Sequence, residues 1–191
     1  MPTSKHAMPR VYTMSDYTSN DGIQTAIFGP PFWFTIHLVS FNYPVDPSET
    51  QKLQYANWLL SIGEILPCCY CRDNFPNNVV AATTRQSMNV MTSRHTFSRF
   101  CYDLHDEVNK MLNKTSPPFD QVRDQFEVCR AKCLTEAQKL NLLNSQKELG
   151  CVRPAHVGTK GKCVLNIVPF GEKIEAFQIS EQCYNLKNKK P

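Results

Sequence analysis

The stretch from Glu64 to Phe75, EILPCCYCRDNF, places three cysteines within four consecutive positions. Pro67 stands directly before the first of them, and proline is typical of a helix start, so the pattern predicts that Cys68 lies at a helix N-terminus. There the backbone N–H groups and the helix dipole lower the pKa of a thiol. The thiolate is the form that exchanges disulfides. Cys68 and Cys71 are therefore the candidate redox pair.

A zinc site is a second reading of the same cluster. Structural zinc needs four cysteine or histidine ligands, usually in two close pairs. The cluster would supply one pair, and the C-terminal third would supply the other: Cys129 with Cys133, or Cys151 with His156. Spacing is the whole of this argument, so we assign no metal, but the reading stays open as a non-enzymatic interaction module.

Simple burial is a third reading, because free cysteine is among the most buried residue types. It suits Cys101, which lies between Phe100 and Leu104 in a helical pattern. Cys69 occupies a variable position inside the motif, and we expect it to be a bystander. A Cys-x-x-Cys at a helix start is better suited to redox chemistry than to packing.

The composition indicates an ordinary globular protein. The chain has 191 residues, 41% of them hydrophobic and 20% charged. This length is enough for a core without disulfides, although the chain contains nine cysteines. The net charge of +4 is small and scattered, which does not favour a nucleic-acid partner.

The sequence is rich in cysteine but shows no signal for secretion. The N-terminus, MPTSKHAMPRVYTMSDYTSNDG, is polar and lacks the apolar region of a signal peptide. No stretch approaches the roughly 20 apolar residues that a membrane span needs. Disulfides are rare in reducing compartments unless they are catalytic. The combination favours cysteine chemistry over a disulfide scaffold.

The residue pattern predicts a helical protein with a small β extension. We expect a first helix with Pro30 and Pro31 in its first turn and Pro44 after its end. The expected helices are 28–43, 53–66 after a capping box, 69–80, 92–114 and 119–149, the last one interrupted near residue 135. The segments 162–170 and 173–180 resemble two strands of a hairpin.

Two helices place polar and aromatic side chains in pairs. Trp33 and His37 are four residues apart on the first helix, and His105 and Asn109 are four apart on the fourth, so each pair projects from one face. Together they would form a pocket for a flat ring with polar edges. Taken singly, such a Trp is more often core, and such a His is more often a satisfied core or surface residue; the set favours the pocket. Lysines near the end of the fourth helix would meet phosphates.

Taken together, these motifs make the chain resemble the Erv/ALR family of FAD-linked sulfhydryl oxidases from about residue 28 to 119. The family patterns are Trp-x3-His, Pro-Cys-x-x-Cys and His-Asn-x-Val-Asn. The matching stretches are Gly29 with WFTIH at 33–37, FNYP at 41–44, PCCYC at 67–71, and SRHTFSRF at 93–100 leading into LHDEVNKMLNK at 104–114. The run FDQVRDQF at 119–126 is similar to the branch found in large DNA viruses.

The resemblance implies a mainly α fold, a four-helix bundle with a short fifth helix, usually homodimeric. It implies FAD as the cofactor, Cys71 against the flavin and Cys68 toward the substrate. Electrons would pass from protein thiols, or from a small redox relay protein, to FAD and then to O2, giving H2O2. The implied cofactor-binding residues are Gly29, Trp33, His37, Cys71, His105, Val108, Asn109, Lys110, Lys114 and Phe119.

The chain departs from the family pattern at several positions. Pro30 stands where the family commonly has arginine, and Asp106 follows His105 where the family has asparagine. A catalytically impaired relative therefore stays an alternative. The family's Cys-x16-Cys bridge has no counterpart in place. Expected replacements and additions are Cys133–Cys151 and Cys163–Cys183 as structural disulfides, with a shuttle role for the C-terminal cysteines as the other option.

The expected organisation has three parts: a flexible tail at 1–22, the FAD-binding oxidase domain at 23–145 and a cysteine-containing extension at 146–191. For a viral member, the resemblance implies the cytoplasm of an infected cell or the virion. For a cellular member it implies the mitochondrial intermembrane space. Neither a nucleic-acid partner nor a membrane span is expected.

Overall fold

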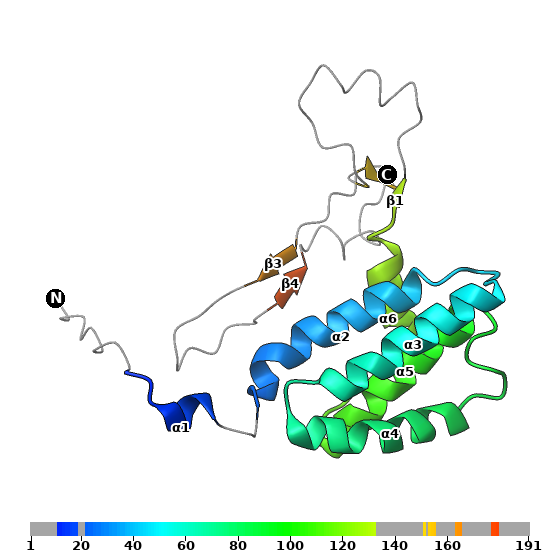
Figure 1. Cartoon of the computed structure of the whole chain (residues 1–191). Helices are drawn as coiled ribbons and strands as arrows, with labels where there is room; N and C mark the ends of the chain where they lie inside the picture. The colour runs from blue at the N-terminus through cyan, green and yellow to red at the C-terminus, as the bar shows by residue number, and fades with distance from the viewer. Residues whose placement is uncertain are drawn as a thin grey trace.

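The computed structural model describes residues 11–18, 22–132, 151, 153–155, 163–165 and 177–179, and its elements are mainly helices (Figure 1). The helices are α1 (Met14–Tyr17), α2 (Thr25–Phe41), α3 (Glu49–Ile65), α4 (Cys69–Thr84), α5 (Arg94–Met111) and α6 (Phe119–Glu127). The strands are β1 (Ala131–Lys132), β2 (Arg153–Pro154), β3 (Cys163–Leu165) and β4 (Phe177–Ile179). The helical expectation is confirmed. None of the helices in the described segments is long and apolar enough to cross a bilayer.

Helix α2 starts earlier than the sequence predicted. It begins at Thr25, so Pro30 and Pro31 lie inside the helix instead of in its first turn. A proline has no N–H, so each one removes the bond to the carbonyl four residues before it. Those carbonyls belong to Ala26 and Ile27, which are exposed, and water can satisfy them. The helix ends at Phe41, before Pro44, as expected.

Side-chain caps fix the starts of α3 and α5. The Ser48 hydroxyl accepts a hydrogen bond from the Gln51 N–H at 3.3 Å, and the Gln51 side chain accepts from the Ser48 N–H at 2.9 Å. This is the capping box that the sequence predicted. Ser93 and Thr96 make the equivalent exchange at the start of α5. A short helix, α1, also lies within the predicted flexible tail and is capped by Thr13.

Helix α6 ends before the interruption that the sequence predicted near residue 135. It ends at Glu127, and the part of the predicted helix from residue 133 to 149 lies outside the described residues. Its buried face consists of Phe119, Val122 and Phe126, and only the cap residue Val128 continues this apolar face. The following chain, with Arg130 and an exposed β1, offers nothing to bury and pairs with β2 in an antiparallel sheet instead.

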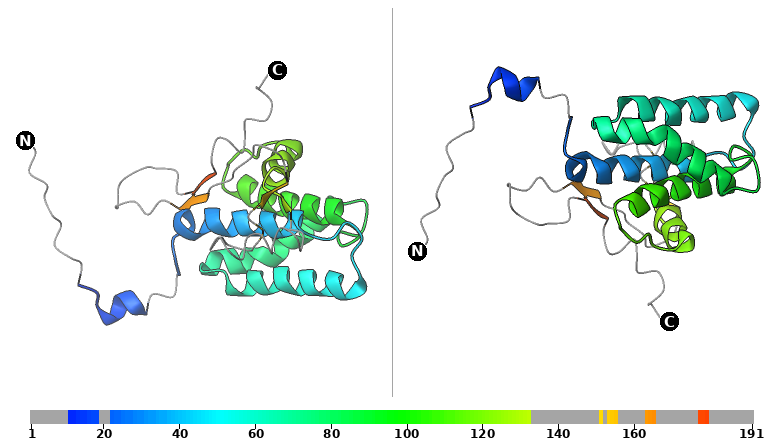
Figure 2. Two further views of the ribbon diagram at one scale, coloured as in Figure 1. Left: turned by 90° about the horizontal axis from the view of Figure 1, so that it is seen from above. Right: turned by 90° about the horizontal axis from the view of Figure 1, so that it is seen from below.

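The bundle is held by an aromatic-rich core. Helix α5 packs against α2 and α4, and α4 also packs against α3, as Figures 1 and 2 show. Phe97 and Leu104 are fully buried on α5. Gly63 allows the close approach of α3 and α4, because a Cβ there would lie 2.1 Å from the Phe75 ring. This packing brings the start of α4 and the face of α5 into one body.

The predicted C-terminal hairpin is present as β3 and β4. The two strands pair antiparallel, with Cys163 opposite Ile179 and Leu165 opposite Phe177. Cys183 and Cys133 lie outside the described residues. Cys151 is exposed. The pairings Cys133–Cys151 and Cys163–Cys183 therefore stay predictions.

Candidate functional site

Cys68 is the N-cap residue of α4, as the sequence predicted. Its backbone is extended (φ −151°, ψ 120°), and its Sγ accepts a hydrogen bond from the Cys71 N–H at 3.2 Å. An N-cap side chain satisfies one of the unpaired N–H groups at a helix start. Cys68 and Cys71 are both free thiols in this structure.

A backbone strap, Gly22–Ile23, pairs with the chain just before α4, at Pro67 and Cys68. The Ile23 N–H donates to the Pro67 carbonyl at 2.5 Å, and Gly22 forms an antiparallel bridge with Cys68. Gly22 has φ +90°, and a Cβ there would lie 2.2 Å from the Pro67 oxygen. Only glycine fits such an approach. The strap is a feature that the sequence analysis missed, since it had assigned residues 1–22 to a tail.

The burial of the two thiols differs from the expected roles. Cys68, predicted to face the substrate, is only 9% exposed, whereas Cys71 is half-buried. The strap pairs with the Cys68 backbone.

Burial controls the acidity of Cys71. It raises the pKa of the Cys71 thiol to about 12, with further increases from the hydrogen bond to Cys68 and from the neighbouring thiols, against a small lowering by Arg72. The lowering that the helix start predicted concerned Cys68, at the first position of the motif, and not Cys71. For Cys71, desolvation outweighs the helix N-terminus, because removal from water penalises the charged thiolate.

Three aromatic rings, two from α2 and one from α5, lie against one another. Trp33 stacks on His105 with ring centroids 4.1 Å apart and planes 5° apart. His37 lies beside them, with its Nε2 2.9 Å from Nδ1 of His105, a hydrogen bond in which one ring donates to the other. The structure thus brings together three of the side chains that the sequence assigned to a pocket.

Both histidines are neutral near pH 7. Burial lowers the pKa of His37 to about 3, with a smaller contribution from His105. Burial also lowers the pKa of His105 to about 4; Asp106 opposes this shift and Lys114 adds to it. The Nδ1 atom of His37 is buried and has no hydrogen-bond partner among the described residues. A buried unpaired nitrogen of this kind is a natural contact for the polar edge of a bound ring.

The remaining predicted cofactor contacts on and after α5 divide into two groups. Asn109 donates to the Ser116 hydroxyl at 3.0 Å, and Lys114 lies close enough to His105 to lower its pKa. Val108 is half-buried on the same helix. Lys110, in contrast, forms ion pairs with Asp106 and Glu107 at 3.1 and 2.9 Å. Two carboxylates against its ammonium group make Lys110 the weaker phosphate contact.

Gly29 and Phe119 lie outside this convergence. A Cβ at Gly29 would meet nothing within 4 Å, so packing within the chain does not require glycine there. Phe119 is 9% exposed and packs with Phe41 in a second apolar cluster. The aromatic of α6 that reaches the pocket is Phe126, whose ring lies 5.4 Å from that of His37.

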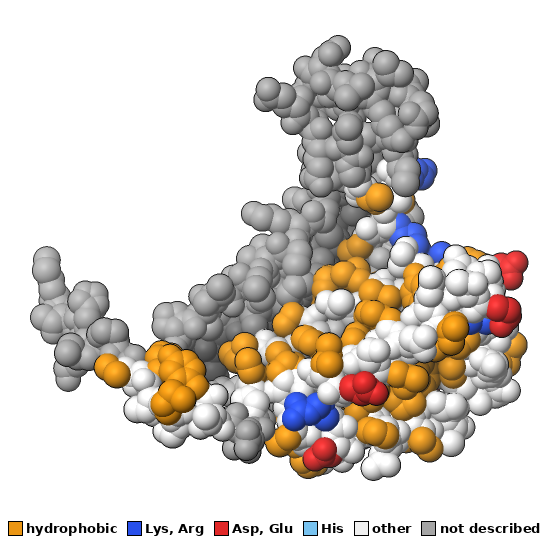
Figure 3. Space-filling model, in the orientation of Figure 1, with side chains coloured by type: hydrophobic (Ala, Val, Ile, Leu, Met, Phe, Trp, Pro, Cys, Tyr) orange, Lys and Arg blue, Asp and Glu red, His pale blue; other side chains and the backbone are white. Residues whose placement is uncertain are grey.

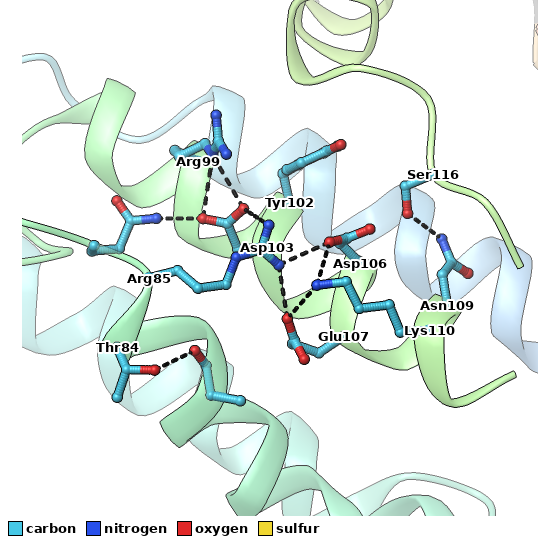
Figure 4. A network of polar contacts seen from close by, with 12 residues as sticks. Thr84, Arg85, Arg99, Tyr102, Asp103, Asp106, Glu107, Asn109, Lys110 and Ser116 are labelled. Atoms are coloured by element: carbon cyan, nitrogen blue, oxygen red, sulfur yellow. Dashed lines mark hydrogen bonds and ion pairs between the residues drawn. The ribbon is translucent and has the colours of Figure 1, made fainter. Parts of the chain in front are cut away.

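Sequence reasoning also missed a charged network on α5. Figure 4 shows Arg85, from the end of α4, between the carboxylates of α5. Asp103 is only 1% exposed, and it accepts from Gln86 at 2.5 Å and pairs with Arg85 at 3.1 Å. The i, i+4 spacing of Arg99 and Asp103 could have indicated one of its pairs, whereas the link from Arg85 depends on tertiary packing.

This chain is similar in sequence to known proteins. The model of the Erv1 / Alr family matches residues 30–127. The chain belongs to the Erv1/Alr family. The match includes the dithiol and the three converging rings, and it falls inside the predicted domain 23–145, whose boundaries stay predictions.

Relatives in the Erv1/Alr family come mostly from large DNA viruses. A protein of African swine fever virus named "FAD-linked sulfhydryl oxidase" is 28% identical over 100 residues, covering 52% of this chain and 80% of the relative. A putative enzyme of the same name from Invertebrate iridescent virus 3 is 30% identical over 118 residues, covering 60% and 78%. The solved yeast Erv1 core matches with 23% identity and a TM-score of 0.48, covering 66% of this chain and 95% of that one.

Proposed function

We propose that this protein is a FAD-dependent sulfhydryl oxidase that forms disulfides in protein thiols. The observation that carries the proposal is the Cys68/Cys71 dithiol at a helix N-cap in a member of the Erv1/Alr family. The curated relatives are named FAD-linked sulfhydryl oxidases, which supports the same activity and the same cofactor.

The pocket on α2 and α5 fits the proposed cofactor. Trp33 and His105 form a flat stacked surface, and the unpaired Nδ1 of His37 offers a hydrogen bond to a ring edge. Neutral histidines can make such contacts without placing a charge in the pocket. Asn109 and Lys114 would contact the more polar parts of the cofactor, with Lys114 favoured over Lys110 for phosphate. Gly29, Val108 and Phe119 stay in the proposed set on the resemblance alone.

FAD, when bound, accepts two electrons from a dithiol and passes them to O2 to give H2O2, chemistry that side chains cannot supply. The chain's own part is thiol–disulfide exchange. In the oxidised enzyme, a substrate thiolate attacks Sγ of Cys68, the Cys68–Cys71 bond breaks, and Cys71 leaves with the electron pair. The second substrate thiol, as thiolate, then attacks the substrate sulfur, releases Cys68 and completes the substrate disulfide.

The cap geometry assists this exchange at Cys68. The Cys71 N–H points at Sγ of Cys68 at 3.2 Å, so it stabilises negative charge on that sulfur when Cys68 is the leaving group. The raised pKa of Cys71 favours its protonated form in the reduced dithiol. The carboxylate of Asp106, which stands where the family has asparagine, pairs with Arg85 and Lys110.

Partners and location follow from the same proposal. Substrates are protein thiols or a small redox relay protein, and O2 is the acceptor. We propose a homodimer; exposed leucines on α2 and α3 (Leu38, Leu53 and Leu60) would support one, and Figure 3 shows hydrophobic side chains across this face. Light scattering after gel filtration tests the dimer. For a viral member, the site of action would be the infected cell's cytoplasm or the virion.

The visible spectrum of the purified protein tests the cofactor proposal. We expect a yellow protein whose flavin bands persist after gel filtration, and a weaker flavin signal in His37→Ala and in Trp33→Ala. A folded, colourless wild type that does not take up added FAD would contradict the proposal. Zinc in metal analysis, with unfolding by a chelator, would favour the interaction module instead.

A further inference from the structure

The end of the dithiol helix is bonded to the pocket helix by a charged clamp, which we define as Arg85 with Asp103, Asp106 and Glu107. Arg85 is the C-cap residue of α4, and all three carboxylates belong to α5. Its guanidinium lies 3.1 Å from Asp103, 2.8 Å from Asp106 and 2.8 Å from Glu107 (Figure 4). A single side chain at the end of α4 thus contacts three carboxylates at positions i, i+3 and i+4 on one face of α5.

The clamp is tightly determined because its central carboxylate is buried. Asp103 is 1% exposed and also accepts from Gln86 and from Arg99. A buried carboxylate is costly unless donors surround it. Any movement of Arg85 away from Asp103 would therefore weaken the pairing of a buried charge.

The rest of the contact between α4 and α5 is apolar. Phe75 and Ala82 of α4 lie in one cluster with Phe97 and Leu104 of α5. Across the part of the chain that the structure describes, the side-chain hydrogen bonds and ion pairs between the end of α4 and α5 come from Arg85 and Gln86. Apolar burial is non-directional, whereas a planar guanidinium accepts only a narrow range of geometries. The clamp therefore determines how far α4 slides along α5.

The position of Arg85 along the axis of α4 is coupled to the position of the dithiol, because both belong to α4 or its caps. Cys71 lies on the same helix, which stays helical through Pro76 between the two residues, so a displacement along the axis at Arg85 is carried toward Cys71. A misplacement of about 1 Å at reacting atoms costs up to roughly a hundredfold in rate. We propose that Arg85 is a positioning residue, which sets the axial register of α4, the helix that begins at the Cys68/Cys71 dithiol, along α5, the helix that carries His105. This inference rests on the proposed oxidase function.

Two arginines allow a matched test. Arg85 and Arg99 both bond Asp103, but Arg99 lies on α5 itself, at i, i+4 from Asp103, and makes no ion pair with α4 among the described residues. Its guanidinium instead lies over the Phe119 ring of α6, 5.2 Å from the ring centroid. The experiment compares FAD-loaded wild type, Arg85→Met and Arg99→Met in O2 consumption with dithiothreitol. It also measures FAD affinity, urea unfolding and hydrogen exchange of the α4 amides without added substrate.

We expect kcat to fall about tenfold or more in Arg85→Met, while its FAD affinity stays close to that of wild type. Hydrogen exchange in α4 should rise in Arg85→Met and not in Arg99→Met, which should keep the wild-type kcat. If Arg85→Met does not fold, Arg85→Lys replaces it. Lysine is a point charge that cannot bridge three carboxylates, so kcat should fall there too.

Two outcomes would overturn the proposal. The first is a wild-type kcat in the folded Arg85 variant, and the second is an equal loss of kcat in both arginine variants, which would indicate stability alone. A wild-type protein that binds no FAD and consumes no O2 would instead contradict the proposed function, so the two failures are distinguishable.

Discussion

Substitution of Gly22 by alanine tests whether the strap limits the accessibility of Cys68. The new Cβ would lie 2.2 Å from the Pro67 oxygen, 2.8 Å from the Pro67 carbonyl carbon and 3.2 Å from the Cys68 Cα, all of them backbone atoms. None can rotate away as a flexible side chain would. Alanine at φ +90° is also strained, by about 1–2 kcal/mol. The strap must therefore lift from Pro67.

The magnitude is bounded by what the strap contributes when it is in place. Lifting it breaks the Ile23–Pro67 hydrogen bond, worth about 1 kcal/mol, and relieves the alanine strain. We expect the free energy of unfolding to fall by about 1–3 kcal/mol, without loss of the helical bundle. The larger effect should be on the accessibility of Cys68, which is only 9% exposed and whose backbone pairs with Gly22 of the strap.

The assay is the rate at which iodoacetamide modifies Cys68, followed by mass spectrometry, together with urea unfolding. We expect faster modification of Cys68 in Gly22→Ala. Gly29→Ala is the matched control, since a Cβ there meets nothing within 4 Å. It should raise stability by about 0.5–1 kcal/mol, as alanine is the better helix former, and leave Cys68 unchanged. A Gly22→Ala protein with wild-type stability and wild-type Cys68 reactivity would refute this account of the strap.

Three further predictions concern the pocket and the core. Burial lowers the pKa of His37 to about 3 and of His105 to about 4, so only the unfolded chain takes up these protons as pH falls below about 6.5. The stabilisation is therefore present at pH 7, and the free energy of unfolding should decrease by roughly 3 kcal/mol at pH 5. The substitution His37→Phe should reduce this loss. Equal stability at both pH values would contradict the neutral histidine pair. Phe126→Ala should cost about 3–5 kcal/mol in urea unfolding and weaken FAD binding, since Phe126 is 7% exposed and contacts His37; unchanged FAD affinity would separate Phe126 from the pocket. Cys101 is fully buried, and burial raises its pKa, so it should stay unmodified in folded protein and react only in urea.

Local signals in the sequence predicted most of the helical framework. Ser48 with Gln51 marked the start of α3, and Pro67 before Cys68 marked the start of α4, because caps depend on neighbouring residues alone. The pairs Trp33/His37 and His105/Asn109 were identified by helical spacing. The convergence of Trp33, His37 and His105 was a tertiary inference, which the four motifs in order made possible.

The errors occurred where tertiary contacts outweigh local preference. The prolines of α2 were predicted in the first turn, but exposed carbonyls let the helix start at Thr25. The helix predicted at residues 131–132 is replaced by the pairing of β1 with β2, and the predicted segment 133–149 lies outside the described residues. The strap and the clamp join residues far apart in sequence, Gly22 with Cys68 and Arg85 with Asp103. No local pattern predicts such contacts.

The pKa of Cys71 shows the same limit at the site. The sequence suggested no shift for this thiol, and burial raises its pKa to about 12. Burial is a property of the folded chain, so a sequence motif could suggest the reactive pair but could not predict its acidity.

An oxygen electrode gives the most direct test of the central claim. With dithiothreitol as the substrate, FAD-loaded wild type should consume O2 and produce H2O2 in equal amounts. Cys71→Ser should abolish consumption while it keeps the bound flavin, and Cys69→Ser should retain consumption. Oxygen consumption that survives Cys71→Ser, or its absence in a flavin-loaded wild type, would contradict a Cys68/Cys71 sulfhydryl oxidase.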